Sequence, residues 1–226
     1  MLPLWDDAPR RRPAVVTAML IAANLGVFIY EGVLASQGGR ALPSFLIEHS
    51  LVPQRLLGGL ADGQQWLTIF TAMFLHGGVA HVAGNCWFLW IFGKNVEDRL
   101  GPVRYILFYL FSGLGAAALQ VAMDTGSTLP MLGASGAISG VLGAYLALFP
   151  TAWIFTLVPW VVPIVPLPAF VLLIVWFGLQ ALNGVGSLMN DEMARGGVAW
   201  WAHAGGFLTG LIVTIMLRRK GWIKRR

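Results

Sequence analysis

The sequence predicts an all-α membrane protein with six transmembrane helices. Hydrophobic residues make up 57% of the 226 residues, charged residues make up only 11%, and the mean hydropathy is +0.72. Soluble domains are typically about one quarter charged. Apolar stretches recur along the chain, and basic residues cluster before the first and after the last of them. We therefore expect one six-span domain at residues 14–217, between a cytoplasmic tail at 1–13 and a basic cytoplasmic tail at 218–226.

Prolines, glycines and charged residues mark the ends of the six predicted spans. The spans are residues 14–34, 81–92, 105–123, 134–149, 169–182 and 199–217. Each is the core of a helix that is to cross a hydrocarbon layer of about 30 Å. The long first connection, residues 36–78, mixes polar and apolar residues and is predicted to lie in the membrane interface. Loops are predicted at residues 94–104, 124–130 and 183–198, where charged or polar residues gather.

Residues 153–168 are apolar but carry too many prolines for a regular helix. The prolines are Pro159, Pro163, Pro166 and Pro168, and proline in a helix interior removes a hydrogen bond and clashes with the preceding turn. We predict an apolar interfacial loop here. A seventh span would also move the six basic C-terminal residues to the other side of the membrane.

The distribution of lysine and arginine orients the six predicted spans. An even number of spans places both termini on one side, and with the termini in the cytoplasm twelve basic residues lie inside and three outside. Basic residues are enriched in cytoplasmic loops. This predicts a multi-pass protein of a bacterial plasma membrane with the lipid bilayer as its surroundings. The terminal basic clusters are interpreted as membrane anchors and not as a nucleic-acid surface.

Four polar side chains are predicted to lie at one depth, just below the outer face. With this topology spans two, four and six run from outside to inside, and His81, Asn85, Ser135 and His203 all fall near their outer ends. Span four has about 16 residues and reaches only about 24 Å as a helix. Ser135 is therefore expected to be recessed in a water-filled hollow, the setting in which polar groups at membrane depth are tolerated.

Ser135 and His203 have the chemistry of a nucleophile and its general base. A serine hydroxyl becomes a good nucleophile when an imidazole within hydrogen-bond reach takes its proton. Small residues allow two helices to approach closely enough for such a contact. The glycines predicted to permit this packing are Gly133, Gly136, Gly206 and Gly210. Taken alone, the small residues favour packing over catalysis, and His203 could equally be a satisfied interface histidine.

His81 and Asn85 stand four residues apart and so share one face of a helix. An asparagine amide, an imidazole N–H and the backbone N–H of Ser135 at a helix start are suitable donors for an oxyanion. The alternative is that Asn85 joins helices and His81 caps it. His76 is interpreted as a structural loop residue and His49 as a solvated one.

These motifs, in this order, resemble the rhomboid intramembrane serine proteases. The matching residues are His81 and Asn85 opening span two, the run Gly133-Ala134-Ser135-Gly136 opening span four, and Ala202-His203 with Gly206 and Gly210 in span six. The run Val96-Glu97-Asp98-Arg99-Leu100-Gly101 also resembles the loop after span two. The resemblance implies a six-helix rhomboid bundle that cleaves single-pass transmembrane proteins near the extracytoplasmic face. It implies Ser135 and His203 as the catalytic dyad and Asn85 and His81 as oxyanion donors.

The chain departs from the family pattern at two places. Trp66 is followed by Leu67, where the first outer loop of the family often has arginine. Ser139 stands where some members place a tyrosine that stacks on the catalytic histidine, so the orientation of His203 must come from elsewhere. Trp176 and Phe177 are candidates for a lateral substrate gate by location.

Other functions and cofactors are disfavoured by residue type. The sequence has no H-E-x-x-H motif and a single cysteine, Cys86, so neither a metal nor another cofactor is expected. A non-catalytic rhomboid-like protein that binds client helices is the main alternative, although such proteins usually lack the serine or the histidine. A transporter is a third possibility, but no inverted repeat is visible.

Overall fold

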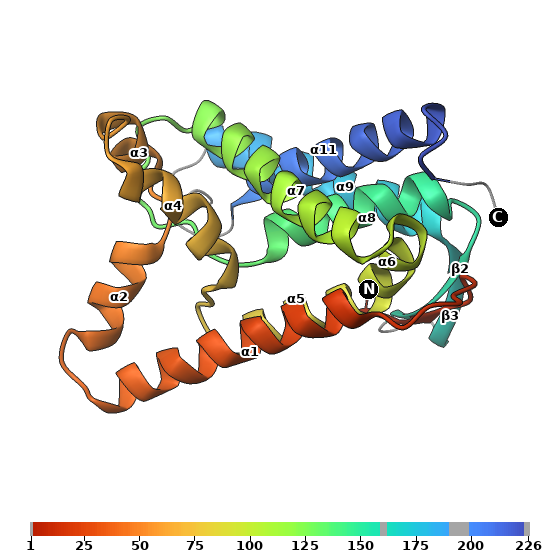
Figure 1. The fold of residues 1–226 in the computed structure, drawn as a ribbon, viewed down its shortest axis with the longest axis horizontal. Helices are drawn as coiled ribbons and strands as arrows, with labels where there is room; N and C mark the ends of the chain where they lie inside the picture. Colours follow the sequence, from red (N-terminus) through yellow and green to blue (C-terminus); the bar gives the residue numbers. More distant parts are fainter. Residues whose placement is uncertain (1, 159–161, 190–198, 224–226) are drawn as a thin grey trace.

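The computed structural model describes residues 2–158, 162–189 and 199–223, and it is a bundle of helices with a small sheet at one end (Figure 1). The elements in chain order are β1 (Leu2–Asp6), α1 (Val15–Ser36), α2 (Ala41–His49), α3 (Pro53–Gly58), α4 (Gly63–Thr71), the 3-10 turn η1 (Ala72–Phe74), α5 (Val79–Phe88), the π-helical turn η2 (Leu89–Gly93), α6 (Lys94–Leu100), α7 (Pro102–Met123), α8 (Ser135–Leu148), β2 (Trp153–Val158), β3 (Val162–Pro168), α9 (Ala169–Met189) and α11 (Trp200–Arg219).

Every predicted span falls on a helix, and the prediction of a helical membrane bundle is confirmed. Within the described residues, α1, α7, α9 and α11 are long and apolar enough to cross a membrane. The run from α4 to η1 and the run from α5 to α6 form a pair bent by 82°, which counts as a fifth span if the pair is one broken crossing. Helix α8 has 14 residues, so it is about 21 Å long and shorter than α1, α7, α9 and α11.

The prediction of a loop at residues 94–104 is wrong, because the helix of span two continues through η2 and α6 to Leu100. Its charged residues are bonded inside the fold instead of solvated. Glu97 is 3% exposed, and its carboxylate accepts hydrogen bonds from the backbone N–H of Val16 and of Thr17 at 2.9 and 2.8 Å. It thereby satisfies donors in the first turn of α1, which have no partner within that helix.

The prediction of an irregular loop at residues 153–168 is also wrong. This stretch forms a β-hairpin, and residues 2–6 of the predicted N-terminal tail pair with it, giving an antiparallel sheet of order β1-β2-β3. A central strand donates backbone N–H groups to the strands on both of its sides. Proline has no N–H to donate, so within a sheet it is confined to edge strands. Pro3 lies in edge strand β1 and Pro163, Pro166 and Pro168 lie in edge strand β3, whereas the central strand Trp153–Val158 has no proline.

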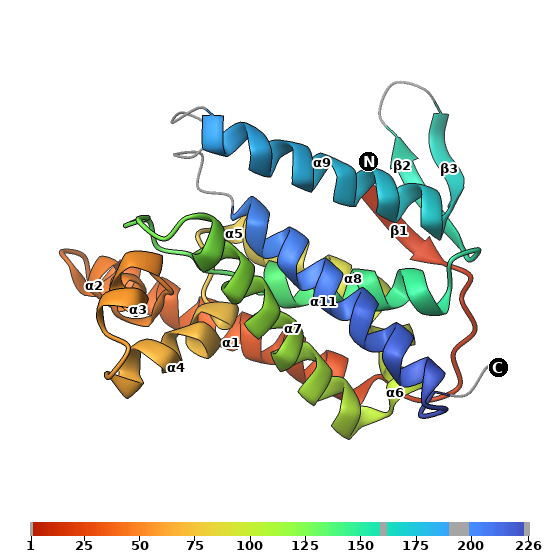
Figure 2. The same cartoon turned by 90° about the horizontal axis from the view of Figure 1, so that it is seen from above.

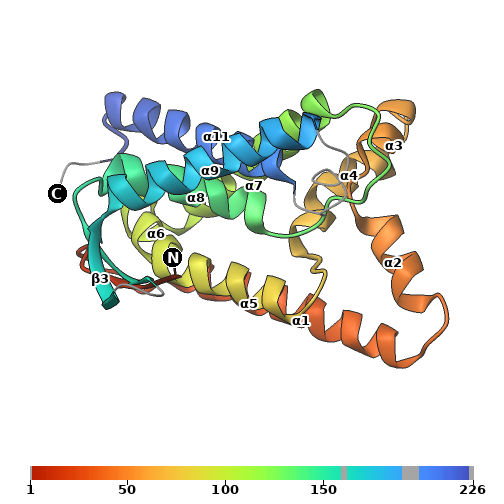
Figure 3. The same cartoon turned by 180° about the vertical axis from the view of Figure 1, so that it is seen from behind.

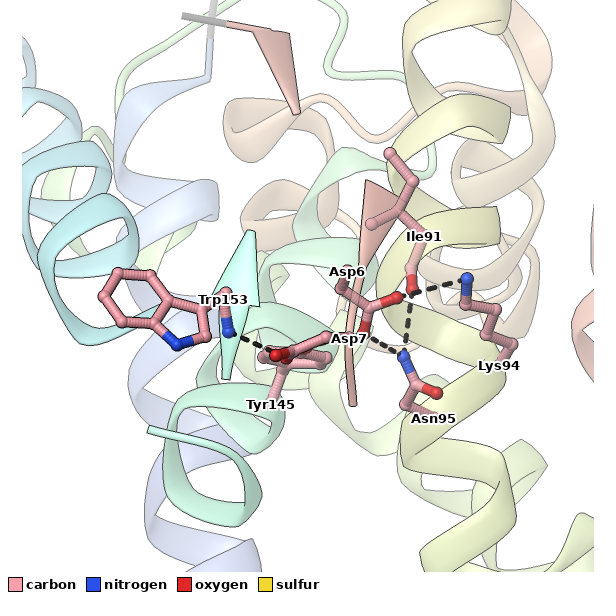
Figure 4. A network of polar contacts seen from close by, with 7 residues as sticks. All are labelled: Asp6, Asp7, Ile91, Lys94, Asn95, Tyr145 and Trp153. Atoms are coloured by element: carbon pink, nitrogen blue, oxygen red, sulfur yellow. Dashed lines mark hydrogen bonds and ion pairs between the residues drawn. The ribbon is translucent and has the colours of Figure 1, made fainter. Parts of the chain in front are cut away.

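A buried carboxylate fastens β1 to the helices (Figure 4). Asp6 pairs with Lys94 Nζ of α6 at 3.2 Å and accepts hydrogen bonds from Asn95 Nδ2 at 2.5 Å and from the Tyr145 hydroxyl of α8 at 2.6 Å. A charge removed from water is stable only when it is paired and hydrogen-bonded. Part of the segment predicted to be a tail is therefore integrated into the core.

The long connection before α5 is helical and lies at the end of the bundle opposite the sheet (Figures 1 and 3). Helices α2, α3 and α4 form it, and the backbone pair Leu51 and Met131 joins it to the loop that precedes α8. The predicted loop at 183–198 is replaced as far as Met189 by the end of α9, and residues 190–198 of that prediction lie outside the described residues. The interfacial position predicted for residues 36–78 stays a prediction.

Helix α8 is enclosed by α5, α7, α9 and α11 (Figure 2). All its residues from Gly136 to Tyr145 are buried. Its contact with α11 is backbone against backbone: a Cβ atom built on Gly206 would overlap the carbonyl oxygen of Gly136, and one built on Gly210 would overlap that of Gly140. Side chains at these positions would push the two helices apart.

Gly206→Ala is therefore expected to lower the thermal stability of the purified protein. The added methyl group would collide with a backbone oxygen that cannot move without displacing α8, and overpacking of this kind typically costs about 1–3 kcal/mol. The apparent unfolding temperature in detergent measures the effect. Gly32→Ala is the matched control, because Gly32 lies on the exposed face of α1 with open space around it. Equal unfolding temperatures for the two variants would contradict the close contact of α8 with α11.

Candidate active site

Ser135 is the first residue of α8, and a glycine turn delivers the chain to it. Gly133 has a φ of +120°, in the region where residues with a Cβ atom are strained. Its N–H donates to the Ala72 carbonyl at 2.8 Å, which fixes the loop against η1. Because the helix begins at Ser135, the N–H of Ser135 has no partner within the helix. The candidate nucleophile and this N–H donor therefore belong to the same residue.

His203 lies in the first turn of α11, directly beside Ser135. Its Nε2 is 2.8 Å from Ser135 Oγ, a hydrogen-bond distance between candidate base and nucleophile. The contact of Gly206 with the Gly136 carbonyl lies about one turn after His203 along α11 and one residue after Ser135 along α8. The glycine contact thus brings the two side chains within reach, as the predicted pairing of spans four and six requires.

The other ring nitrogen of His203 contacts a residue that the sequence analysis did not identify. Nδ1 is 2.8 Å from Oε1 of Gln180, which lies on α9. Ser139 lies one turn after Ser135 and does not donate a hydrogen bond to the imidazole. Its hydroxyl donates instead to the Ser135 carbonyl at 2.6 Å. The signal that could have found Gln180 is an amide in the middle of an apolar span, since polar side chains at such positions are costly and usually functional.

His81 and Asn85 lie on α5 and face the start of α8. Asn85 is 7% exposed, and its Nδ2 has no hydrogen-bond partner among the described residues. Nδ1 of His81 accepts the N–H of Gly77 at 3.4 Å, which leaves the proton of a neutral ring on Nε2. A Cβ atom on Gly133 would lie 2.7 Å from His81 Nε2 and 3.7 Å from Asn85 Nδ2. Both donors therefore point at the turn that carries Ser135.

The four predicted glycines make three different contacts. Gly206 and Gly210 meet the backbone of α8, and a Cβ atom on Gly136 would lie 2.7 Å from Ala116 of α7. Gly133 was predicted to pack against span six, but the structure places it before α8, against His81 of α5. Because Gly133 has no side chain, the ring of His81 fits against it, whereas the close approach to span six does not depend on Gly133.

A cavity of about 380 Å³ connects these groups. Its lining includes the candidate dyad, His81, Asn85, Gln180 and Trp176, together with apolar residues of α5 and α8. Of the two gate candidates, Trp176 lines this cavity, whereas Phe177 stacks on Phe207 at a centroid distance of 4.7 Å. His76, interpreted as structural, is buried and packs its ring 5.1 Å from the ring of His81.

The arrangement has the parts needed for acyl transfer. It has a hydroxyl that is hydrogen-bonded to a possible base, unsatisfied N–H donors beside that hydroxyl, and a recess that admits a substrate. Among the described residues, no group of three or more histidine, cysteine, aspartate or glutamate side chains is placed to hold a metal ion.

Comparison with known proteins identifies the family. The Rhomboid domain profile matches residues 63–220. The chain is 31% identical over 169 residues to "RHOMBOID-like protein 6, mitochondrial" of Arabidopsis thaliana, covering 72% of this chain and 48% of that protein. It is 35% identical over 130 residues to "Rhomboid protease GluP" of Bacillus subtilis, covering 58% of this chain and 24% of that protein.

A second bacterial relative gives the same result. The chain is 28% identical over 142 residues to "Rhomboid protease AarA" of Providencia stuartii, covering 57% of this chain and 49% of that protein. The matched regions span about half or less of these relatives' lengths. Since the Rhomboid profile covers most of the chain and the matched residues include all four polar side chains of the site, the chain belongs to the rhomboid family of multi-pass integral membrane proteins.

Proposed function

We propose that this rhomboid protein is an intramembrane serine endopeptidase that uses Ser135 as nucleophile and His203 as general base. The observation that carries the proposal is the 2.8 Å contact between Ser135 Oγ and His203 Nε2 inside a cavity of the bundle. Relatives whose names include "Rhomboid protease" support it. A serine and an imidazole at this distance are rarely needed for packing alone.

The reaction follows from the positions of the donors and acceptors. Ser135 Oγ attacks the scissile carbonyl carbon while its proton passes to His203 Nε2. The negative charge that develops on the carbonyl oxygen is stabilised by Asn85 Nδ2, the N–H of His81 Nε2 and the backbone N–H of Ser135. His203 then gives the proton to the departing amine, and an acyl-enzyme ester remains. Water, deprotonated by the same imidazole, hydrolyses the ester and restores Ser135.

We further propose six spans with both termini in the cytoplasm. The sheet, α6 and the last turn of α11 lie at one end of the bundle and α2 to α4 at the other (Figure 1). Basic residues concentrate at the first of these ends, as cytoplasmic ends require. Ser135, at the opposite end of the short helix α8, then lies below the extracytoplasmic face. The bacterial plasma membrane fits this charge pattern best.

The proposed substrates are single-pass membrane proteins whose transmembrane helix unwinds near that face, with a small residue before the cleaved bond. A client-binding protein without activity is the alternative, because relatives named only rhomboid-like also match the chain. It is disfavoured by the presence of both the serine and the histidine.

Ser135→Ala is expected to abolish covalent labelling by a fluorophosphonate probe and cleavage of a single-pass test substrate in liposomes. The substitution removes the only atom proposed to attack, and it leaves the helix contacts in place. In-gel fluorescence of the labelled protein and the appearance of substrate fragments measure the two effects. Ser112→Ala is the control, because Ser112 is a buried serine on α7 whose hydroxyl has no partner and which does not line the cavity. Unchanged labelling of Ser135→Ala would refute Ser135 as nucleophile.

Asn85→Ala is expected to lower kcat by about 10²–10³ with little change in KM, the usual effect of losing one oxyanion donor. Because Asn85 Nδ2 has no partner in the free protein, its loss breaks no bond of the resting state, and the unfolding temperature should stay close to that of the wild type. Steady-state cleavage of the test substrate gives both constants. A rise in KM at constant kcat would assign Asn85 to substrate binding instead.

A further inference from the structure

Both ring nitrogens of His203 are hydrogen-bonded, and the second bond comes from a helix outside the α8–α11 pair. Nε2 meets Ser135 Oγ and Nδ1 meets Gln180 Oε1, each at 2.8 Å. Gln180 belongs to α9 and also lines the cavity. The contact is therefore part of the site, although no step of the proposed reaction involves Gln180.

We propose that Gln180 is the positioning residue of His203, which selects the tautomer that can act as a base. The proposal rests on the function proposed above. A neutral imidazole carries one proton, and only the nitrogen without it can accept the proton of Ser135. The side-chain oxygen of Gln180 accepts a hydrogen bond from Nδ1–H, and this keeps the lone pair of Nε2 directed at the serine. The partner of the other nitrogen commonly sets the tautomer of a histidine in this way.

Little else in the described site can set the orientation of the ring. The residue one turn after the nucleophile is Ser139, and its hydroxyl is turned back to the Ser135 carbonyl. The rings of Trp176 and Trp200 have their centroids 6.1 and 6.4 Å from that of His203. Those distances are near the upper end for aromatic contacts, and ring contacts do not distinguish one nitrogen from the other. Only the amide oxygen of Gln180 does so.

The inference also gives α9 a role in the chemistry. Helices α8 and α11 hold Ser135 and His203 at the right distance, whereas α9 determines which nitrogen carries the proton. If the amide of Gln180 presented its NH₂ group instead, Nδ1 would be the acceptor, and Nε2–H would donate to Ser135 and leave it unactivated. The orientation of the amide is therefore the property to test.

The tautomer is measured directly by ¹⁵N NMR of the full-length protein in micelles, with ¹⁵N-labelled histidine rings at about pH 8, where an ordinary imidazole is neutral. Comparison with His203→Asn assigns the His203 signals among those of the four histidines. We expect Nδ1 protonated and Nε2 unprotonated. The opposite tautomer in the wild-type protein would overturn the proposal without requiring any variant of Gln180 to fold.

Two substitutions at Gln180 test the effect on the reaction. Gln180→Met keeps the length of the side chain but removes the acceptor, and the labelling rate should fall by about 10²-fold, as for other small misplacements of a catalytic group. Gln180→Glu retains an acceptor oxygen in either protonation state, so it should keep most of the rate. In Gln180→Met kcat should fall while KM stays the same, and in Gln180→Glu both constants should stay close to those of the wild type. Asn183→Leu is the matched control, an amide-to-aliphatic change on α9 outside the cavity lining.

The outcomes separate this inference from the proposed function. If the wild type does not label at all, the protease assignment fails. If the wild type labels, Ser135→Ala does not, and Gln180→Met labels at the wild-type rate, the protease assignment stands and the role of Gln180 is refuted. A Gln180→Glu variant as slow as Gln180→Met would also contradict the role, because the acceptor would then not be the property that matters.

Discussion

The contact of two glycine backbones is the constraint on which the rest of the structure depends. Gly206 of α11 rests on the carbonyl oxygen of Gly136 in α8, with no side chain between them. Helices separated by large side chains keep their axes about 8–10 Å apart, too far for a serine at the end of one to meet a histidine in the first turn of the other. Small residues bring the backbones together, and the polar contact between Ser135 and His203 follows from that approach.

A short central helix provides the second condition, a place for polar groups at membrane depth. Helix α8 is buried from Gly136 to Tyr145, and with 14 residues it is shorter than α7, α9 and α11. The space left at its start is the cavity that the polar residues of α5, α9 and α11 line. Polar groups inside a membrane protein persist where they face such a space or each other, and here they do both. The unpartnered Nδ2 of Asn85 fits its proposed role as a donor kept free for a substrate oxygen.

The charged residues near the other end hold the scaffold together. Glu97 caps the first turn of α1, and Asp6 ties the N-terminal strand to α6 and α8. Each carboxylate is buried, and each is satisfied by several donors, which is what makes its burial tolerable. The strand β1 in turn pairs with the hairpin that leads into α9, so a contact far from the cavity supports the helix that carries Gln180.

The sequence by itself determined what depends on periodicity and residue type: a helical membrane bundle, the positions of its spans, and the candidate residues Ser135, His203, Asn85 and His81. Long-range pairing was decided only by the tertiary structure. No local pattern shows that residues 2–6 will pair with Trp153–Val158, or that Glu97 will reach the start of α1. The same holds for Gln180, because a hydrogen bond to His203 depends on how α9 packs beside α11, and the spacing of residues along one chain does not contain that distance.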